Sequence, residues 1–442
     1  IERDKSQMIN KIKNLIVDNV DDFVITKTES TSNQNKFANN NVVVNKNWNQ
    51  ESYDLFISIR DKDGFKVGNT DINLNLDIEK QIKNLIRFTN NTPVNTNYLK
   101  IYDENKKYRD LKSLYDSNVK NLDSSKILRD VIDLSIQKGA DRVGGVLEHG
   151  WGKVNKLTSS GFEGQYEFSN INLSTRVMKE DASSHKVKIS NSVKNFTYRP
   201  IILSAVEEAK NAIFPEKIKS GKYDCIFYPM SFANLVNEIG RSSSYDNVIG
   251  GFSFLNNKLN KNVSSDVFSL YDVGNLNGGH ASAPFDYEGR PSKPTEIIGS
   301  GIMKNYLTNT SQSIKYNLPA TSNSSILNVS PTNLVVPIGK KSNEKLIQKM
   351  DEGLIITNSW YHRYQNYMTG DFSLLPRDAI FKVKEGKIIG SVKDVRISGN
   401  MIDVMKNIDD MSNKKESILN WESSIPSDVP AALIKNLNFT SI

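Results

Sequence analysis

Apolar residues recur at helical spacing in two segments near the start of the chain, residues 6–17 and 77–88. They are Met8, Ile12, Leu15 and Ile16 in the first segment, and Ile78, Ile82, Leu85 and Ile86 in the second. Residues three and four positions apart lie on one face of a helix, so each set forms a single apolar stripe. The pattern therefore predicts two amphipathic helices, each with one buried face.

The residues between these helices favour strands. Segments 22–28 and 41–46 are rich in β-branched residues, and segment 55–60 alternates between apolar and polar side chains. Asp63-Gly64 follows as a hairpin turn signal. The order helix, strands, helix predicts an antiparallel sheet that is covered by helices on one face.

A second set of elements follows a polar connector at residues 89–110. Asp123-Ser-Ser is a helix-capping sequence, and the helix that it begins is expected to stop at Gly139. Four strands are predicted at 143–147, 153–157, 165–178 and 186–195. Pro200 then opens a helix at 201–213, where proline is tolerated in the first turn.

The pattern of predicted elements changes after Gly221. A strand at 223–228 leads into a helix at 229–239, and from Gly250 onward short strands alternate with Gly, Asn and Pro turns. Two further helices are expected, at 345–351 and 401–408. The prediction is an α+β protein with an α/β N-terminal part, which has an antiparallel sheet and covering helices, followed by a β-rich C-terminal domain. The expected domains are an N-terminal α/β subdomain at residues 1–90, a second α/β subdomain at 110–215 and the β-rich C-terminal domain at 221–442.

Charge and cysteine content indicate which partners and which cellular compartment the protein is expected to have. The 442 residues carry 57 basic and 50 acidic side chains, a net charge of +7, and the basic residues are scattered. Such scatter is typical of a solvated surface rather than of a nucleic-acid site. There is one cysteine, Cys225, so no internal disulfide can form, and no apolar leader or membrane-length apolar run is present. We expect a cytoplasmic protein that does not enter a membrane.

The usual signatures of catalysis are missing from the sequence. The four histidines are His149, His185, His280 and His362, and no two of them are spaced to share one face of a helix. Cys225 lies in a strand pattern and is expected to be a buried, inert core residue. There is no Gly-x-Ser-x-Gly elbow on a strand–turn–helix and no phosphate-binding glycine loop.

Two other segments concentrate polar or aromatic side chains. In residues 283–291, Asp286 and Glu288 would project from the same face if the segment is extended, and paired carboxylates can exchange protons or hold a cation. The alternative is a strand that runs into a Gly-Arg-Pro turn with Arg290 in a salt bridge. In residues 360–373, several aromatic side chains are interleaved with Arg363. Such a segment could stack nucleic-acid bases, line a peptide channel or pack an irregular loop.

The order of short motifs along the chain resembles the TldD/PmbA family. Residues 61–68 and 159–167 fit a weaker N-terminal pattern, and the resemblance covers roughly residues 5–410. The motifs that carry it, in chain order, are Gly251–Leu255, Phe268–Asp272, Pro284–Gly289, Ile298–Gly301, Pro331–Leu334, Gly353–Ile355, Thr369–Ser373 and Ile397–Met401.

The resemblance implies an α/β N-terminal part, a β-rich C-terminal domain, and dimers that enclose a chamber where extended peptides are cut. In TldD-type members a helix carries His-Glu-x-x-x-His, and a cysteine near the C-terminus completes a zinc site. Here the corresponding segment is Tyr228–Glu238, which has no histidine, and no cysteine follows Ile408. The chain thus resembles the PmbA branch, also called TldE.

The resemblance further implies a metal-free subunit with no catalytic residue of its own. Its expected partner is a TldD-type subunit that holds the zinc, and its expected substrate is a peptide or unfolded protein. For the chain alone, a homodimer is the alternative. The candidates for lining the peptide chamber are Asp286, Glu288, Gly289, Gly370, Asp371, Phe372 and Ser373.

Two other functions are kept as alternatives. One is a stand-alone metallopeptidase that uses ligands foreign to the family, such as His280 with Asp286 and Glu288. The other is a modulator that interacts with DNA or gyrase, with which the isoelectric point near 9.0 is compatible. The lack of a basic cluster argues against the second alternative.

Overall fold

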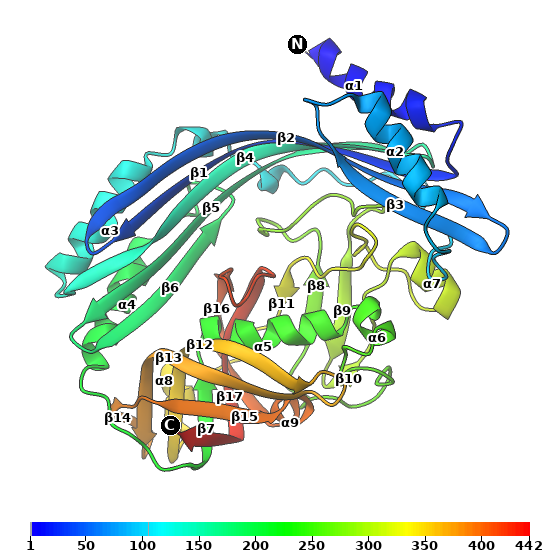
Figure 1. The fold of residues 1–442 in the computed structure, drawn as a ribbon. Coiled ribbons are helices and arrows are strands. Elements are labelled where there is room, and N and C mark those ends of the chain that lie inside the picture. The colour runs from blue at the N-terminus through cyan, green and yellow to red at the C-terminus, as the bar shows by residue number, and fades with distance from the viewer. Residues whose placement is uncertain (1, 105) are drawn as a thin grey trace.

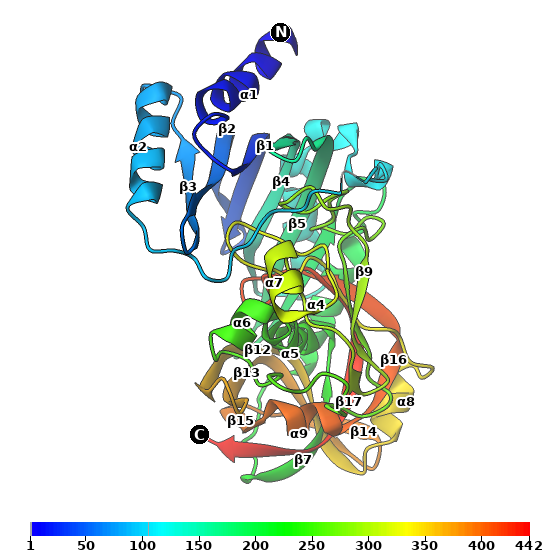
Figure 2. The same cartoon turned by 90° about the vertical axis from the view of Figure 1, so that its right-hand side faces the viewer.

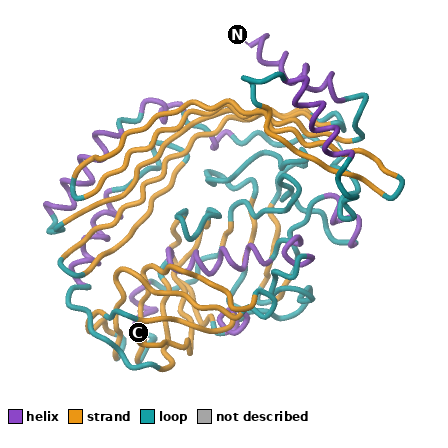
Figure 3. Tube along the Cα trace, viewed as in Figure 1, coloured by secondary structure: helices purple, strands orange, loops and turns teal. Residues whose placement is uncertain are grey.

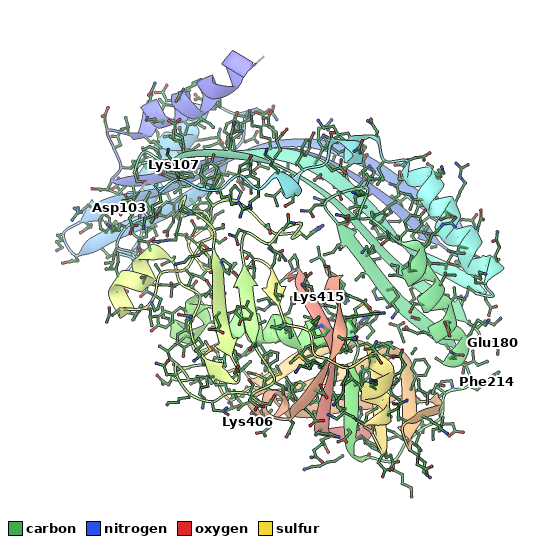
Figure 4. All side chains as sticks on the ribbon, turned by 180° about the vertical axis from the view of Figure 1, so that it is seen from behind. Asp103, Lys107, Glu180, Phe214, Lys406 and Lys415 are labelled. Carbon is green, nitrogen blue, oxygen red and sulfur yellow. The ribbon has the colours of Figure 1, made fainter. Side chains whose placement is uncertain are left out.

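The computed structural model describes residues 2–104 and 106–442, with side chains described from residue 8 onward. A long, curved sheet from the N-terminal half arches over a sheet-rich C-terminal part (Figure 1). The view from the side shows that loops of the C-terminal part rise to the underside of the arch (Figure 2). Strands outweigh helices in both parts, as the tube view makes plain, and the α+β fold class is confirmed (Figure 3).

The arch is a six-stranded antiparallel sheet in the order β3-β2-β1-β4-β5-β6. The central pair joins β1 to β4 and runs from Val24↔Thr158 to Phe37↔Gly145. The strands of the arch are β1 Asp22–Ala38, β2 Asn41–Asp61, β3 Gly64–Ile72, β4 Arg142–Thr158, β5 Glu163–Lys179 and β6 Ala182–Ser190.

Two strands of the arch are longer than the sequence pattern indicates. The segments predicted at 41–46 and 55–60 form the single strand β2, and those at 143–147 and 153–157 form β4. The polar stretch inside β2 stays extended because it pairs with β1 throughout, with Asn33 opposite Asn47 and Thr31 opposite Asn49. Their side chains also bond across the strands, at 2.6 Å and 2.7 Å.

Helices cover the convex face of the arch near both of its ends. At one end, α1 Glu2–Ile16 and α2 Ile78–Asn90 bury the predicted stripes against Phe23, Ile25 and Leu55. At the other end, α3 Ser124–Gln137 and α4 Arg199–Asn211 cover β4 and β5. The sheet runs without a break across the predicted boundary between residues 90 and 110, because β1 pairs with β4.

The C-terminal part contains an eleven-stranded sheet among the described residues, in which β17 Ser427–Ser441 pairs with β7, β11, β15 and β16. The remaining strands are β7 Gly221–Phe227, β8 Leu270–Val273, β9 Pro294–Gly299, β10 Ile302–Met303, β11 Leu334–Val335, β12 Glu352–Asn366, β13 Asp371–Lys384, β14 Lys387–Ser391, β15 Val395–Asn400 and β16 Ile408–Ile418.

The helix α5 Pro229–Ser242 lies on this sheet beneath the arch and is almost completely buried (Figure 1). Its apolar residues Phe232, Leu235, Val236 and Ile239 join the main core of the C-terminal part. The other helices are α6 Tyr245–Ile249, α7 Thr310–Tyr316, α8 Asn343–Gln348 and α9 Met401–Lys406, with 3-10 turns at Lys112–Leu114 and Ser117–Asn121. None of the described helices is long and apolar enough to cross a membrane.

Candidate functional site

The segment in which Asp286 and Glu288 would share a face if it were extended is a tight turn beneath the arch, which agrees with the alternative of a turn at Gly289. The backbone N–H of Gly289 donates to the Asp286 carbonyl oxygen at 3.2 Å, which closes the turn. Gly289 has a φ of +83°, and a Cβ there would lie 2.6 Å from the Phe162 ring. Only glycine meets both conditions without strain. Asp286 and Glu288 therefore do not alternate along a strand.

Asp286 organises the backbone of this turn. Its Oδ1 accepts N–H bonds from Glu288 and Arg290, both at 3.0 Å, and its Oδ2 accepts from Ser324 at 3.2 Å. Burial is the main cause that raises the pKa of Asp286 to about 7, and the nearby Glu288 carboxylate adds to it. The carboxyl is thus a structural acceptor that also sits close to neutral titration.

Glu288 is 5% exposed and accepts a hydrogen bond from the Thr310 hydroxyl. Burial raises its pKa, while the bond from Thr310 acts in the opposite direction. Arg290 donates to the same Thr310 oxygen at 2.9 Å and lies 4.2 Å from the Tyr102 ring. Arg290 therefore stacks and hydrogen-bonds, and no salt bridge of it is present among the described residues.

Tyr287 ties the turn to the arch. Its hydroxyl donates to Asp54 on β2, and its carbonyl oxygen accepts from the Lys156 ammonium of β4 at 3.0 Å. The same ammonium lies 4.3 Å from the centre of the Tyr287 ring. Burial lowers the pKa of Lys156 to about 8, against the pull of the surrounding carboxylates. Sequence reasoning missed Asp54 and Lys156, because they are far from Tyr287 along the chain.

A pocket of about 340 Å³ opens between this turn and the concave face of the arch. Its lining includes several hydroxyl side chains, among them Thr26 and Thr28 of β1 and Ser324 and Thr332 of the C-terminal loops. A larger hollow of about 610 Å³ lies where α1, β1 and β4 meet, and it is lined by Lys27, Glu29 and Lys153. None of the seven chamber candidates except Asp286 lines either hollow.

The second predicted segment forms the junction between β12 and β13. Gly370 has a φ of +84°, with the Phe254 Cβ 3.0 Å from where its own Cβ would be, so it makes the turn that starts β13. Asp371 is exposed and accepts from Thr369 at 2.5 Å and from Asn400 at 2.9 Å. Phe372 and Ser373 are buried, at 2% and 8% exposure. Residues 370–373 lie together at the junction of β12 and β13. Asp286–Gly289 instead form a turn between β8 and β9.

His362 stands out from the other histidines. Among the described residues, neither of its ring nitrogens has a hydrogen-bond partner, and the ring lies beside Tyr364 and Phe372 at centroid distances of 5.1 Å and 4.8 Å. Burial lowers its pKa to about 3, with the nearby Arg363 and Arg241 acting in the same direction. His362 is therefore neutral at physiological pH.

Neither Cys225 nor His280 has the surroundings of a catalytic residue. Cys225 is fully buried in β7, and burial raises the pKa of its thiol well above the usual range. Within residues 2–104 and 106–442, no three His, Cys, Asp or Glu side chains converge as metal ligands. His280 is accordingly not gathered with Asp286 and Glu288 into a metal site in that part of the chain.

Helix α5 corresponds to the segment that resembles the zinc-binding helix, and its polar side chains are occupied. The Asn234 amide donates to the Ser359 carbonyl oxygen at 2.7 Å and accepts from the Ser423 hydroxyl. The Asn237 amide donates to the Ser427 hydroxyl at 2.9 Å and accepts from the Ile425 N–H at 2.8 Å. Amides bound in this way do not fit a zinc ion, which takes imidazole, thiolate or carboxylate ligands.

Comparison with known proteins settles the family. The sequence profile of the PmbA/TldA metallopeptidase C-terminal domain matches residues 220–441, half of the chain. The protein belongs to the PmbA/TldD family. The match begins one residue before β7 and ends with β17, so it takes in the entire sheet-rich part of this family member.

Relatives support the assignment at low identity. The "Uncharacterized protein MJ0231" of Methanocaldococcus jannaschii is 23% identical over 68% of this chain and 72% of its own length. A "Metalloprotease PmbA homolog" of Buchnera aphidicola is 29% identical over 49% of this chain and 47% of its own. A "Metalloprotease TldD homolog" from the same species is 22% identical over 52% and 47%. The chain thus aligns with only about half of these two metalloprotease relatives.

Solved structures share the whole fold. TldE from Thermococcus kodakarensis superposes with a TM-score of 0.85 at 18% identity, covering 98% of this chain and all of that one. TM0727 from Thermotoga maritima, described as a candidate modulator of a DNA gyrase, gives a TM-score of 0.86 at 21% identity with 98% and 100% coverage. At such identities the likeness establishes the fold of this PmbA/TldD protein and nothing about its activity.

Proposed function

We propose that this chain is the non-catalytic, metal-free subunit of a PmbA/TldD-type metallopeptidase complex that degrades or trims peptides. The observation that carries the proposal is the polar face of α5. Where the resemblance places a His-Glu-x-x-x-His helix, this chain has Asn234 and Asn237, whose amides are bonded to the neighbouring strand and loop.

The remaining acid on that helix does not replace the missing ligands. Burial raises the pKa of Glu238, and its carboxylate lies 3.9 Å from the Arg241 guanidinium. A zinc ion needs at least three protein ligands in a catalytic site, and α5 offers this one carboxylate. We therefore assign the zinc and the hydrolytic chemistry to a TldD-type partner, with this chain completing the chamber around the peptide.

The deciding experiment measures zinc content and peptidase activity of the purified chain, of a TldD-type subunit from the same organism, and of their mixture. We expect no stoichiometric zinc on this chain and no cleavage of an unfolded peptide by it alone. Mixing should give a complex in which one zinc per pair accompanies cleavage. The TldD-type subunit with its zinc-binding histidines replaced is the control, and its mixture should be inactive.

Two results would contradict the proposal. Stoichiometric zinc and peptide cleavage by the lone chain would mean that it is a peptidase with ligands foreign to the family, and replacement of His280 or Glu288 would then be tested for loss of metal. Absence of any complex with the TldD-type subunit would remove the partnership itself. A cytoplasmic location and binding of a peptide also belong to this proposal.

A further inference from the structure

An aromatic and basic surface lies on the C-terminal half of β12, the neighbouring part of β13 and the loop before β17. We call it the aromatic–arginine surface, and it consists of Trp360, Tyr361, Arg363, Arg377 and Trp421. Trp421, in the loop between β16 and β17, is 71% exposed, and Tyr361 is 42% exposed. Arg363 and Arg377 are exposed as well. Large aromatic side chains and arginine are the residues that dominate protein recognition surfaces.

Trp360 holds the surface together. Its ring lies 5.1 Å from the Arg377 guanidinium carbon and 4.7 Å from that of Arg176, which comes from β5 of the arch. Trp421 meets Trp360 edge-on, with ring centroids 6.2 Å apart and planes at 80°. Arg176 is neutralised by the buried Asp378 at 2.9 Å. The stacking thus positions Arg377 and Trp421 on a support that both halves of the molecule build.

A bulge in the sheet turns Tyr361 outward. The pairing of β12 with β13 shifts register between Trp360 and Arg363, and Tyr361 within the bulge has a φ of +55°. An aromatic residue rarely adopts this left-handed region, because its Cβ crowds the backbone. The strained conformation places the Tyr361 ring 5.7 Å from the Arg363 guanidinium carbon and 6.0 Å from that of Arg377. Bulges commonly redirect side chains beside functional sites.

The charge of the surface is not balanced within the described part of the chain. Arg363 and Arg377 form no ion pair with any carboxylate in residues 2–104 and 106–442, and Arg363 donates only to the His362 carbonyl oxygen at 2.9 Å. Glu422 is a nearby half-buried acid, and its Oε1 accepts the Tyr361 N–H at 3.1 Å. The carboxyl of Glu238 on α5 also lies close enough to Arg363 for the guanidinium to act on its pKa. Neither carboxylate forms an ion pair with Arg363 or Arg377 within the described residues, so both exposed guanidinium groups can accept a carboxylate from outside the chain.

We propose that the aromatic–arginine surface binds acidic segments of polypeptide, with Arg363 and Arg377 gripping carboxylates and Trp421 covering an adjacent apolar side chain. A guanidinium held flat against an aromatic ring is preorganised for a two-pronged bond to a carboxylate. The inference deepens the proposed function, on which it rests for the view that this chain meets peptides. It adds a preference for acidic residues among those peptides.

A nucleic acid fits the same surface less well. Single-stranded binding needs a groove that follows successive phosphates, and aromatic rings with free faces on which bases stack. Among the described residues of this surface, two guanidinium groups form no ion pair, and arginine side chains already lie against the rings of Trp360 and Tyr361. One or two carboxylates of a peptide match this geometry, whereas a phosphate backbone would require a longer basic track.

The test is fluorescence anisotropy of the isolated chain with short fluorescein-labelled peptides. One peptide alternates Glu with Ser and carries a central Leu, and its matched control has Gln at every Glu. We expect the Glu peptide to bind about tenfold more tightly in low salt, and the preference to fall as salt is raised, because screening weakens exposed charge pairs.

Variants locate the effect. The double variant Arg363→Gln with Arg377→Gln should weaken binding of the Glu peptide about tenfold, and Trp421→Ala should weaken both peptides alike. Arg396→Gln, which changes an exposed arginine of β15, is the matched control and should bind as the unaltered chain does. All of these side chains are exposed, so folding should be unaffected, which circular dichroism checks.

Three outcomes would overturn the inference. They are equal affinity for the Glu and Gln peptides, loss of binding in the Arg396→Gln control to the same degree as in the double variant, and tighter binding of a labelled oligothymidylate than of the Glu peptide. None of them bears on whether the chain forms an active complex with a TldD-type subunit. Failure of that reconstitution, with the peptide preference intact, would reject the proposed function alone.

Discussion

The Tyr287 hydroxyl, in a turn of the C-terminal part, donates a hydrogen bond to the Asp54 carboxylate on β2 of the arch, 233 positions away in the chain. Burial raises the pKa of Asp54, and the bond from Tyr287 is the largest cause that opposes this rise. The contact therefore joins the two parts of the molecule and also stabilises a half-buried carboxylate.

Replacing Tyr287 by Phe should lower the free energy of unfolding by about 1 to 3 kcal/mol, because Asp54 would lose the donor that compensates its burial. Denaturant-induced unfolding at neutral pH measures the change. Tyr223→Phe is the matched control, since its hydroxyl donates to the Lys219 carbonyl oxygen at an exposed position. A loss no larger than in the control would show that the contact contributes little.

Replacing Gly289 by Ala should destabilise the protein by about 2 to 4 kcal/mol, because the new Cβ would meet both an unfavourable φ and the Phe162 ring. Gly278 has a similar φ of +68° with nothing within 4 Å of its Cβ position, so Gly278→Ala should cost only about 1 kcal/mol. The difference between the two variants isolates the contact with Phe162, and equal losses would refute it.

His362 should make the protein sensitive to acid. Its folded-state pKa of about 3 lies below its ordinary value of 6.5, so the unfolded chain binds a proton first as pH falls. The contribution of neutral His362 to the free energy of unfolding is complete above pH 6.5 and is lost as pH falls from about 6.5 to 3. At pH 5 the loss amounts to about 2 kcal/mol. His362→Phe should remove this part of the loss.

The same variant should have nearly unchanged stability at pH 7, because both His362 nitrogens lack partners in the part of the chain that the structure describes and the surroundings are aromatic. Unfolding curves at pH 7 and pH 5 for both proteins provide the comparison. An identical pH dependence with and without His362 would mean that this ring reaches water or a proton acceptor in the folded state.

Cys225 should be unreactive in the native protein and reactive once it unfolds. The side chain has no exposed surface and its pKa is raised, so little thiolate forms and no reagent reaches it. Labelling with a thiol reagent such as DTNB should give no modification under native conditions and one per chain in denaturant. Rapid native labelling would show that β7 opens readily.

The sequence predicted best those elements that local patterning determines. The stripe of Ile78, Ile82 and Leu85 located α2, and the run from Pro229 to Ile239 located α5, since each helix buries a face that recurs every three to four residues. The family resemblance is confirmed by the match of residues 220–441 to the profile of the PmbA/TldA metallopeptidase C-terminal domain. The helix at Thr310–Tyr316 was missed, although Asn309 and Gln312 form a capping box that its sequence could have revealed.

Long-range contacts account for what the sequence could not show. The polar middle of β2 is a strand because β1 pairs with it, and the turn at Asp286 depends on Ser324, 38 positions away. The seven residues proposed to line a chamber stay a prediction. The structure adds that Glu288 and Phe372 are buried within this chain, which no alternation pattern indicates.

The central position of β17 has a consequence for how the protein is made. β17 bonds to β7, β11, β15 and β16, so the sheet around it cannot close until residues 427–441 have emerged from the ribosome. The arch, in contrast, needs nothing beyond β6 for its own ladder of strands. During synthesis the arch can therefore fold first. Until β17 is available, the unpaired strands of the C-terminal part keep their apolar faces exposed, and chaperones can bind them.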